Sequence, residues 1–490
     1  MSLKQQAVRG LKWTTAASVV SAVTQLLQTF VLARLLTKND FGLMALAMVF
    51  VGFTQIFADM GITNAIIHKK DITHSQLHTV FFVNIFIGAF LCLILFFVAP
   101  LVSLFYEHPE LTNMIRWLSL IFIVQPFGQI YNALLRKELQ FDAIAKRDML
   151  IKIIGLCISV GLALWGFGVY SFVGAQLSMI LLSVILLIIL GRKLYCPKWH
   201  ISRTDILPFI SFSMYQAGNQ LVAFTRGQFD ILLIGKIMSI EWVGLYNMAK
   251  RVIDFPISII NPIVTQVSFP VMAKIQDETL RLKNVFLKSI SSIVAFSFPI
   301  YAFIALFATA ILKIAAGEQW LPAAPLMQIL CIYAVIRAIG NPTGSLLLAK
   351  GLVRRAFWWD FACLFIMTPF LFLGIPFGIT GITWGFTISY LVIIVPLWYF
   401  LVRPTIFCGL NEYLSQLFRP FCTAILLAIL LLPIAIWINH SLVQLIAGGI
   451  IFLLAFMPVA RYINPPFYAE LKLQILEAWK KHIKFNNPIK

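Results

Sequence analysis

Seven charged residues lie inside stretches of the chain that are otherwise apolar enough to cross a membrane. They are four cations and three carboxylates: Arg226, Lys250, Arg251, Arg337, Asp59, Asp230 and Asp254. A charge inside hydrocarbon is costly, so an ionisable residue retained there is a candidate functional residue. The cations suit the binding of an anionic group such as a phosphate, and the carboxylates suit the binding of a coupling proton or sodium ion.

Two pairs of these residues are spaced so that opposite charges share a helix face. Arg226 and Asp230 are four residues apart, as are Lys250 and Asp254. Arg226 and Lys250 lie at a similar depth, roughly 15 Å from the turn near residues 239 and 240, which is close to the middle of a bilayer. Two interpretations follow: the cations bind a substrate anion, or each pair neutralises itself and stabilises the helix packing.

The remaining three charges have no opposite charge four residues away in their own helix. Arg251 is accompanied only by Phe255, whose ring offers a cation–π surface. Arg337 either binds substrate or contacts backbone carbonyls at a kink near Pro342. Asp59 has no cation within four residues, so it either takes part in ion coupling or merely ends its helix.

Amide side chains recur at helical spacing in two of the apolar stretches: Gln25, Gln28, Gln216, Asn219 and Gln220. Such polar stripes suit a cavity that holds a sugar, and they equally suit hydrogen bonds between helices. Pro262 follows Asn261 and predicts a broken helix, and together with Pro342 it is a candidate hinge.

A metal site and a cofactor are not predicted. The chain has 7 Cys and no CxxC motif. His68, His74 and His78 lie near one another, but no Cys or acidic cluster accompanies them, and a solvated loop accounts for them.

The composition places these residues in a membrane protein. The chain has 490 residues, of which 60% are hydrophobic and 12% charged, with a formal net charge of +19. A soluble multidomain enzyme carries about 25% charged residues, and a nucleic-acid binder needs a solvated basic face that this chain does not offer. The expected class is therefore an all-α polytopic membrane protein.

Fourteen transmembrane helices are expected from the apolar segments. Residues 153–191, 361–402 and 420–460 contain no charged residue, and each is long enough for two helices of about 20 residues joined by a turn. The expected helices are 12–36, 41–62, 79–105, 113–135, 148–166, 169–191, 206–237, 241–271, 286–315, 322–349, 357–375, 379–402, 419–438 and 441–460.

The distribution of Lys and Arg predicts the orientation. With the N-terminus in the cytoplasm, 29 Lys and Arg fall in cytoplasmic segments and 5 in the opposite ones. The positive-inside rule therefore predicts cytoplasmic N- and C-termini. In the C-terminal tail, apolar residues at helical spacing between residues 467 and 484 fit either an interfacial helix or a frayed basic tail.

A weak internal repeat divides the chain. Gly42-Leu43 corresponds to Gly244-Leu245, and Phe167-Gly168 corresponds to Phe377-Gly378. The offset near 210 spans six helices, so the halves insert in the same orientation. We expect six-helix bundles at residues 1–204 and 205–405, with two extra helices and a basic tail at 406–490. Such a design places the substrate site between the bundles and gives access to each side alternately.

Two segments resemble a known family. Ala33-Arg34-Leu35-Leu36-Thr37 followed by Asp40-Phe41-Gly42-Leu43, and Leu134-Leu135-Arg136-Lys137-Glu138-Leu139-Gln140-Phe141, are similar to the Wzx-type polysaccharide exporters, in the branch named for the colanic acid exporter. These belong to the multidrug/oligosaccharidyl-lipid/polysaccharide superfamily. The resemblance implies a V-shaped, MATE-like pair of bundles.

The resemblance also implies a location in the bacterial inner membrane, a function and partners. The expected substrate is an undecaprenyl-pyrophosphate-linked oligosaccharide, flipped from the cytoplasmic to the periplasmic leaflet by cation-coupled alternating access, for O-antigen, capsule or exopolysaccharide synthesis. Membrane lipids, a polysaccharide polymerase and a chain-length regulator are the expected partners.

Other functions remain open at this point. A lipid II flippase or a multidrug antiporter of the same superfamily is the main alternative. A membrane polysaccharide polymerase or ligase is disfavoured, because the predicted outside loops are short and carry no recognisable catalytic motif. We therefore expect a transporter rather than an enzyme.

Overall fold

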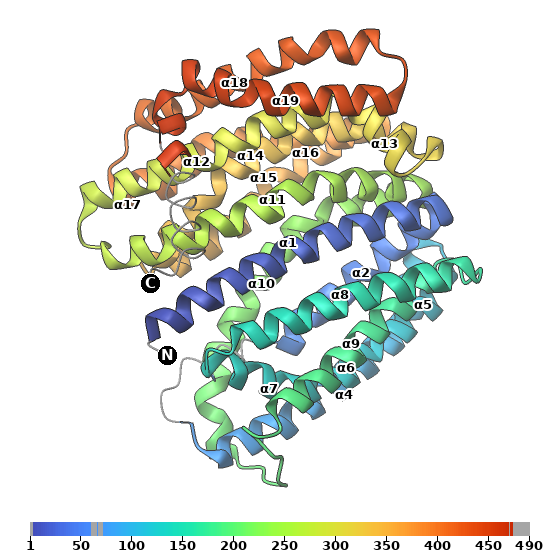
Figure 1. Ribbon diagram of the computed structural model, residues 1–490. Coiled ribbons are helices and arrows are strands. Elements are labelled where there is room, and N and C mark those ends of the chain that lie inside the picture. Colours follow the sequence, from blue (N-terminus) through green and yellow to red (C-terminus); the bar gives the residue numbers. More distant parts are fainter. Residues whose placement is uncertain (1–2, 60–65, 67–71, 470, 474–490) are drawn as a thin grey trace, which may run out of the picture. The chain divides into compact units, whose positions relative to one another are not determined.

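The computed structural model describes residues 3–59, 66, 72–469 and 471–473, and these residues are helical apart from short turns and connections (Figure 1). Side chains are not described at residues 3–12, 59, 207–216, 263, 266 and 267. The chain forms two compact units. Unit 1 comprises Met1–Arg251 and Trp359–Phe365, and unit 2 comprises Val252–Trp358 and Ile366–Lys490.

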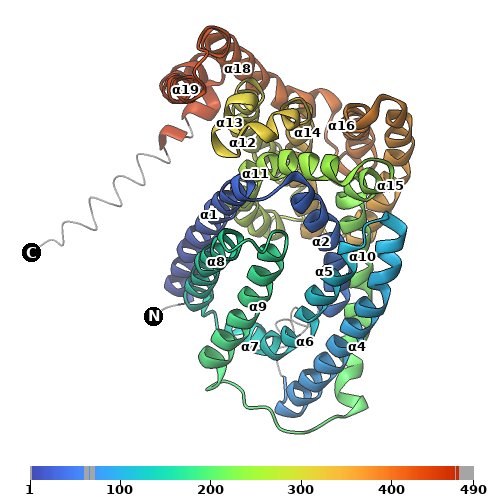
Figure 2. The same ribbon diagram turned by 90° about the vertical axis from the view of Figure 1, so that its right-hand side faces the viewer.

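Unit 1 is built from long helices joined by short turns. Its helices are α1 (Leu3–Leu35), α2 (Lys38–Asp59), α4 (His74–Tyr106), α5 (Glu110–Ser119), α6 (Ile121–Val124), α7 (Pro126–Lys137), α8 (Phe141–Leu164), α9 (Tyr170–Gly191), α10 (Arg203–Ile237) and the first part of α11 (Ile240–Lys274). Helix α8 packs along both α1 and α9, and α2 packs against α10 (Figure 2). One buried apolar cluster joins α4, α7 and α9 and includes Val80, Ile130 and Leu187.

Unit 2 contains the rest of α11 and the C-terminal helices. These are α12 (Thr279–Leu306), α13 (Ala308–Ala315), α14 (Ala324–Ala349), α15 (Val353–Gly374), α16 (Gly378–Leu397), α17 (Arg403–Ile406), α18 (Leu410–Trp437) and α19 (Ser441–Ile463). Helix α12 packs against α14 and α18, and α18 packs against α19. A buried cluster that includes Phe286, Leu346 and Tyr413 forms the core of this packing.

Many of the helices have the length and composition of membrane spans. Within the described residues, nine helices are long and apolar enough to cross a membrane, or ten if a bent pair counts as one span. That pair is Glu110–Val124 and Pro126–Lys137, with an angle of 49° between its parts. The single helix expected at 113–135 is therefore wrong. Pro126 lies at the break, where its ring removes a backbone donor.

The three turns expected in the long uncharged segments are confirmed. Helices α8 and α9 are joined at Gly166 and Gly168, which have φ of +83° and +54°. Helix α16 begins at Gly378, where φ is +67°, and Asn439 lies between α18 and α19. Helices α15 and α16 approach so closely that a Cβ added at Gly385 would lie 2.2 Å from the Phe370 carbonyl oxygen. Glycine is required at that contact.

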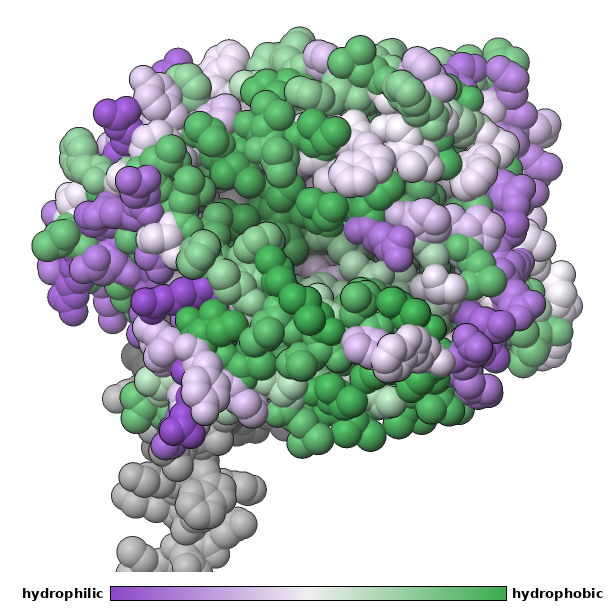
Figure 3. Space-filling view, turned by 90° about the horizontal axis from the view of Figure 1, so that it is seen from above, coloured by the Kyte–Doolittle hydropathy of each residue, from purple (hydrophilic) through white to green (hydrophobic). Residues whose placement is uncertain are grey.

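The exposed surface is apolar where a bilayer would touch it. In the face shown in Figure 3, hydrophobic residues cover the middle and hydrophilic residues gather along two opposite edges. On α19, Leu453 and Leu454 are 72% and 70% exposed, and Ile436 on α18 is 61% exposed. An apolar surface of this extent is stable only against lipid, so the chain is a multi-pass membrane protein.

The beginning of the C-terminal tail packs on unit 2. Phe467 is buried beside Ala295 and Ala460, and its ring centroid lies 5.0 Å from that of Phe296. Most of the predicted interfacial helix at 467–484 lies outside the described residues.

Candidate functional site

Five of the seven charged residues singled out by the sequence lie on the two longest helices, α10 and α11. Helices α10 and α11 each contain 35 residues, which corresponds to about 52 Å of helix and exceeds the roughly 30 Å of a hydrocarbon core. Unit 1 holds Arg226, Asp230, Lys250 and Arg251, and unit 2 holds Asp254 and Arg337. The side chain of Asp59, the last residue of α2, lies outside those described.

Asp230 forms the core of a buried hydrogen-bonded network in unit 1. Its side chain is 0% exposed, and one carboxylate oxygen accepts hydrogen bonds from Lys250 Nζ at 2.6 Å and from Tyr246 Oη at 2.7 Å. The other oxygen accepts from the backbone N–H of Ile231 at 2.9 Å. Lys250 Nζ also donates to the carbonyl oxygen of Gly227 at 2.9 Å. Both charges are thus paired and satisfied, as a structural ion pair requires.

Arg226 pairs with a carboxylate that sequence reasoning missed. Its Nη2 lies 3.3 Å from Asp360 Oδ1, and the two side chains are 26% and 25% exposed. The helix expected from the sequence begins at residue 357, so Asp360 in its first turn is grouped with the preceding loop rather than with the interior charges. Helix α15 begins at Val353, so Asp360 lies two turns inside it. The neighbouring residues Trp359 and Phe361 were the available signal, because a loop carboxylate is seldom set between large apolar residues.

The third ion pair lies in unit 2. Arg337 Nη1 on α14 donates to Asp254 Oδ1 on α11 at 2.7 Å, and both side chains are 42% exposed. The Arg337 guanidinium also lies 6.0 Å from the centre of the Tyr333 ring. The contact with carbonyls near Pro342, considered from the sequence, is replaced by this ion pair. A half-exposed ion pair is tolerated at membrane depth only where its surface faces water or polar groups.

The predicted ion pairs within single helices, Arg226 with Asp230 and Lys250 with Asp254, are both wrong. Asp230 binds Lys250 rather than Arg226, and Asp254 binds Arg337 rather than Lys250. All three ion pairs join different helices. Spacing along one helix shows which side chains share a face, but the neighbouring helix supplies competing partners that spacing cannot reveal.

Arg251 is an interior cation that forms no ion pair with a carboxylate among the described residues. Its guanidinium carbon lies 6.0 Å from the centre of the Phe41 ring, so the cation–π partner is Phe41 on α2 rather than Phe255. No hydrogen bond or ion pair joins its guanidinium to another described residue. This cation is therefore available to an anionic ligand.

The amide stripes are partly satisfied within the fold. Gln28 Nε2 on α1 donates to Ser159 Oγ on α8 at 3.0 Å, which is the interhelical bond that the sequence left open. Gln25 and Gln220 are exposed and Asn219 is half-buried. The side chain of Gln216 lies outside those described.

The prolines leave their helices continuous. Helix α11 runs from Ile240 to Lys274 through Pro256, Pro262 and Pro270, and α14 runs through Pro342. The break predicted at Pro262 is therefore wrong, because the helix continues on both sides of the lost backbone donor. A role of either proline as a hinge stays a prediction.

Metal-ligating side chains do not gather in the part of the chain that the structure describes, where no three His, Cys, Asp or Glu could hold one ion. His78 instead makes a structural contact: its Nδ1 lies 3.0 Å from Tyr195 Oη and accepts from the backbone N–H of Lys198 at 3.2 Å. His68 lies outside the described residues.

Comparisons with known proteins agree in sequence and in fold. A family model described as "Polysaccharide biosynthesis protein" matches residues 31–325. An uncharacterised membrane protein of the cps region of Klebsiella pneumoniae is 30% identical over 93% of this chain and 95% of its own length. The lipopolysaccharide biosynthesis protein WzxC of Escherichia coli (strain K12) is 30% identical over 86% of each chain. The teichuronic acid biosynthesis protein TuaB of Bacillus subtilis (strain 168) is 30% identical over 90% and 92%.

Two solved structures share the fold at low identity. The lipid II flippase MurJ in its inward closed conformation has a TM-score of 0.73 at 12% identity and covers 94% of this chain and 99% of its own. An inward-facing multidrug resistance transporter of the MATE family has a TM-score of 0.64 at 17% identity, over 78% and 94%. The family model and the relatives at 30% identity together show that this chain belongs to the polysaccharide biosynthesis protein family, with a fold like those of the MurJ and MATE structures.

Proposed function

We propose that this protein flips a lipid-linked oligosaccharide, carried on undecaprenyl pyrophosphate, from the cytoplasmic to the periplasmic leaflet for surface-polysaccharide synthesis. Three relatives with assigned names act in lipopolysaccharide, teichuronic acid and amylovoran biosynthesis, which supports a polysaccharide unit as the cargo. The observation that carries the proposal is Arg251, an interior cation without a carboxylate partner among the described residues. A pyrophosphate crossing hydrocarbon requires such a cation.

Arg226 and Arg337 support Arg251 in this role. Each forms an ion pair whose side chains are partly exposed, so a phosphate oxygen can compete with the carboxylate for the guanidinium. Lys250 is fully engaged by Asp230, so its contribution is to stabilise α10 against α11. Gln25, Asn219 and Gln220 offer amides for sugar hydroxyls, since none of the three is buried.

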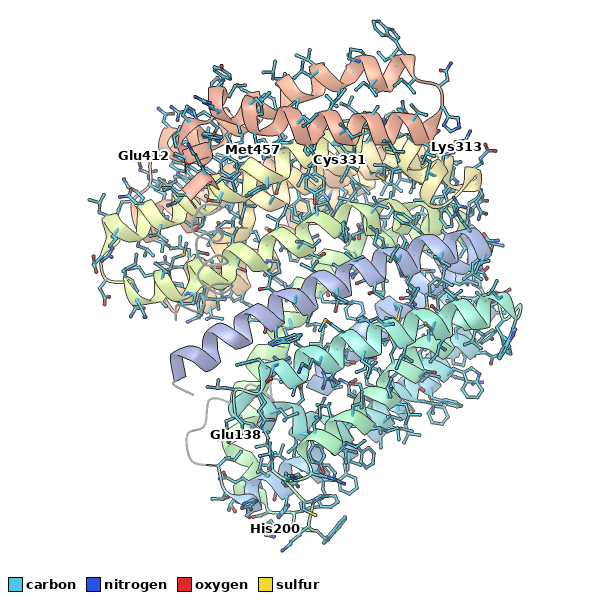
Figure 4. The ribbon with its side chains drawn as sticks, viewed as in Figure 1. Glu138, His200, Lys313, Cys331, Glu412 and Met457 are labelled. Atoms are coloured by element: carbon cyan, nitrogen blue, oxygen red, sulfur yellow. The ribbon has the colours of Figure 1, made fainter. Side chains whose placement is uncertain are left out.

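Fourteen spans with both termini in the cytoplasm are part of the proposal. The segment Val353–Ile406 passes the span criterion as one run of 54 residues, yet it contains the antiparallel helices α15 and α16. In unit 1, Glu138 and His200, both predicted to be cytoplasmic, lie at the same end (Figure 4). In unit 2, Glu412 and Lys313, predicted to face opposite sides, lie at opposite ends with Cys331 between them (Figure 4).

A reciprocal contact supports the parallel repeat and its two six-helix bundles at residues 1–204 and 205–405, followed by 406–490. A Cβ added at Gly42 would lie 2.1 Å from the carbonyl oxygen of Ile240, and one at Gly244 would lie 2.0 Å from that of Lys38. Gly244 follows Gly42 by 202 positions, and Ile240 follows Lys38 by the same number. Equivalent residues thus exchange equivalent contacts, as a pseudo-two-fold axis between α2 and α11 requires.

The proposal includes a coupling ion and partner proteins. Asp59 is the candidate for binding a proton or a sodium ion, together with Asp230 and Asp254 as the carboxylates of the charge pairs. A polysaccharide polymerase and a chain-length regulator in the inner membrane would receive the flipped unit. Transport by the wild-type protein in proteoliposomes that is indifferent to both pH and sodium gradients would remove the coupling role.

The test of the flippase proposal is substitution of Arg251 in cells that depend on this protein for surface polysaccharide. Arg251→Ala should leave the protein inserted in the membrane while the lipid-linked unit accumulates in the inner leaflet, and Arg251→Lys should restore part of the export. Lys236→Ala is the matched control, because it removes a cation from the end of α10. Wild-type export by Arg251→Ala would refute the pyrophosphate assignment.

Arg226 requires a paired design. Arg226→Ala alone leaves Asp360 without its cation, so lost export would have two explanations. The double variant Arg226→Ala/Asp360→Asn removes both charges. Export that stays low in the double variant assigns Arg226 to the substrate, and export that recovers assigns the pair to structure.

A further inference from the structure

Unit 1 contains a pocket, separate from the interior charges, at the end where α1, α7 and α8 meet. Its volume is about 320 Å³, within the range of pockets that hold small ligands, and its lining residues are Thr14, Ala17, Ser18, Ser21, Arg136, Phe141, Ile144, Ala145 and Asp148. The labelled residue Glu138 follows α7 by one position and marks this end of the unit (Figure 4). The flippase mechanism proposed above does not use this pocket.

The pocket lining contains one cation, Arg136, and one carboxylate, Asp148. Asp148 is engaged by Arg147, whose Nε and Nη2 lie 3.0 Å and 2.5 Å from the same carboxylate oxygen. The Arg147 side chain is 9% exposed, and its Nη1 is buried without a hydrogen-bond partner. Arg136 lines the pocket and has no ion pair or hydrogen bond through its side chain to another described residue. Because Arg147 already engages the carboxylate of Asp148, Arg136 is the lining cation that lacks an acceptor.

Hydroxyl groups on α1 face the same pocket. Thr14, Ser18 and Ser21 are four and three residues apart, so they lie on one helix face. Ser18 Oγ donates to the carbonyl oxygen of Thr14 at 2.9 Å, whereas the Ser21 hydroxyl has no partner among the described residues. Ser21 and Arg136 therefore provide donors from two different helices, which suits a group with several acceptor oxygens.

The rest of the lining is apolar. Ala17, Phe141, Ile144 and Ala145 complete the wall. An isolated inorganic ion gains nothing from such a surface, whereas a lipid places its phosphate among the donors and its glycerol or prenyl carbons against the apolar residues. The nearby Lys146 Nζ, held 4.9 Å from the centre of the Trp13 ring, adds a further cation of the kind found at a lipid interface.

We propose that this pocket binds the phosphate of a lipid in the leaflet next to the α7–α8 turn. The leaflet is the cytoplasmic one if the orientation proposed above holds, but binding itself does not depend on flipping. The phosphate belongs either to an anionic phospholipid or to the prenyl carrier. The polar face of α1 that carries these hydroxyls continues with the amides of Gln25 and Gln28 toward the middle of the span. Ser18 and Gln28 are roughly 15 Å apart along the helix.

Lipid binding to the purified full-length protein tests this proposal by native mass spectrometry. The probes are phosphatidylglycerol, undecaprenyl phosphate and zwitterionic phosphatidylcholine, each added to the detergent-solubilised protein. Arg136→Gln should weaken binding of the more tightly bound anionic probe about ten-fold, and Ser21→Ala should weaken it about three-fold. Arg192→Gln is the matched control, since it removes an exposed cation just after α9, outside the pocket lining, and should leave affinity unchanged.

The probes distinguish the two sources of phosphate. Tighter binding of undecaprenyl phosphate assigns the pocket to the carrier, and tighter binding of phosphatidylglycerol assigns it to a membrane lipid. Wild-type affinity in the Arg136→Gln/Ser21→Ala double variant, or equal binding of phosphatidylcholine, overturns the proposal. Thermal unfolding of each variant, expected within a few degrees of wild type, excludes loss of the fold. A protein that binds lipid phosphate but flips nothing refutes the proposed function and leaves this pocket assignment standing.

Discussion

The buried pair of Asp230 and Lys250 makes a prediction that separates structural from substrate-binding charges. Both residues are buried, and Tyr246 Oη donates a further hydrogen bond to the carboxylate. Removing one member of a buried pair leaves an uncompensated charge, which costs about 3–5 kcal/mol. We therefore expect Lys250→Met and Asp230→Asn each to lower the free energy of unfolding by about that amount.

The double variant carries the decisive result. In Asp230→Asn/Lys250→Met neither charge remains, and the Asn carbonyl oxygen can still accept from Tyr246. The free energy of unfolding should return to within about 1 kcal/mol of wild type, giving a coupling energy of about 5 kcal/mol or more between the two sites. Export should recover with it, because the pair then serves the packing of α10 against α11.

Denaturant titration of the four proteins in one detergent measures these energies, and export in cells measures transport. Suppose that the free energy of unfolding of Lys250→Met lies within about 1 kcal/mol of the wild-type value, and that neither this variant nor the double variant exports the polysaccharide unit. Lys250 would then contact the substrate directly, and assigning it to structure would be refuted.

Three further predictions concern other contacts. Gly42→Ala should lower the free energy of unfolding by about 1–3 kcal/mol, because the added Cβ would lie 2.1 Å from a backbone carbonyl oxygen of α11. The hydrogen bond from Ser75 holds the pKa of Asp205 below its usual value. The stability that Asp205 contributes is therefore present above about pH 4 and is lost as the pH falls through the lowered pKa. Hydrogen exchange near residue 205 should show this loss, and Asp205→Asn should abolish the pH dependence. Asp254→Asn should cost no more than about 1 kcal/mol of unfolding free energy, because its ion pair with Arg337 is half-exposed, yet it should change the rate of export.

Each of these has a control or an opposing outcome. Gly161→Ala, at an α8 position where no atom lies within 4 Å of an added Cβ, should leave stability unchanged or slightly raised. Exchange near residue 205 that is independent of pH in the wild type would contradict the Asp205 prediction. A cost of 3 kcal/mol or more for Asp254→Asn would show that this pair is as buried in solution as Asp230.

The fold class and the turns within the three long uncharged segments could be predicted from sequence because their causes are local. Long uncharged runs have no stable alternative to helices in lipid, and glycines at positive φ or helix-ending residues mark where those helices turn. The kink at Pro126 could also have been anticipated from its missing donor. Pro262, by contrast, leaves α11 continuous, so proline alone did not decide where a helix breaks.

For the candidate site, the sequence predicted which residues are interior charges but not which residues they pair with. A small set of charges in apolar helices could be recognised because burying a charge is costly and few such residues are retained. Only the tertiary structure decided the partners: Asp230 with Lys250, Arg226 with Asp360, and Arg251 against an aromatic ring. Helical spacing limits a side chain to one face, whereas its partner is supplied by whichever helix packs on that face, and that choice is made by contacts between residues far apart in the chain.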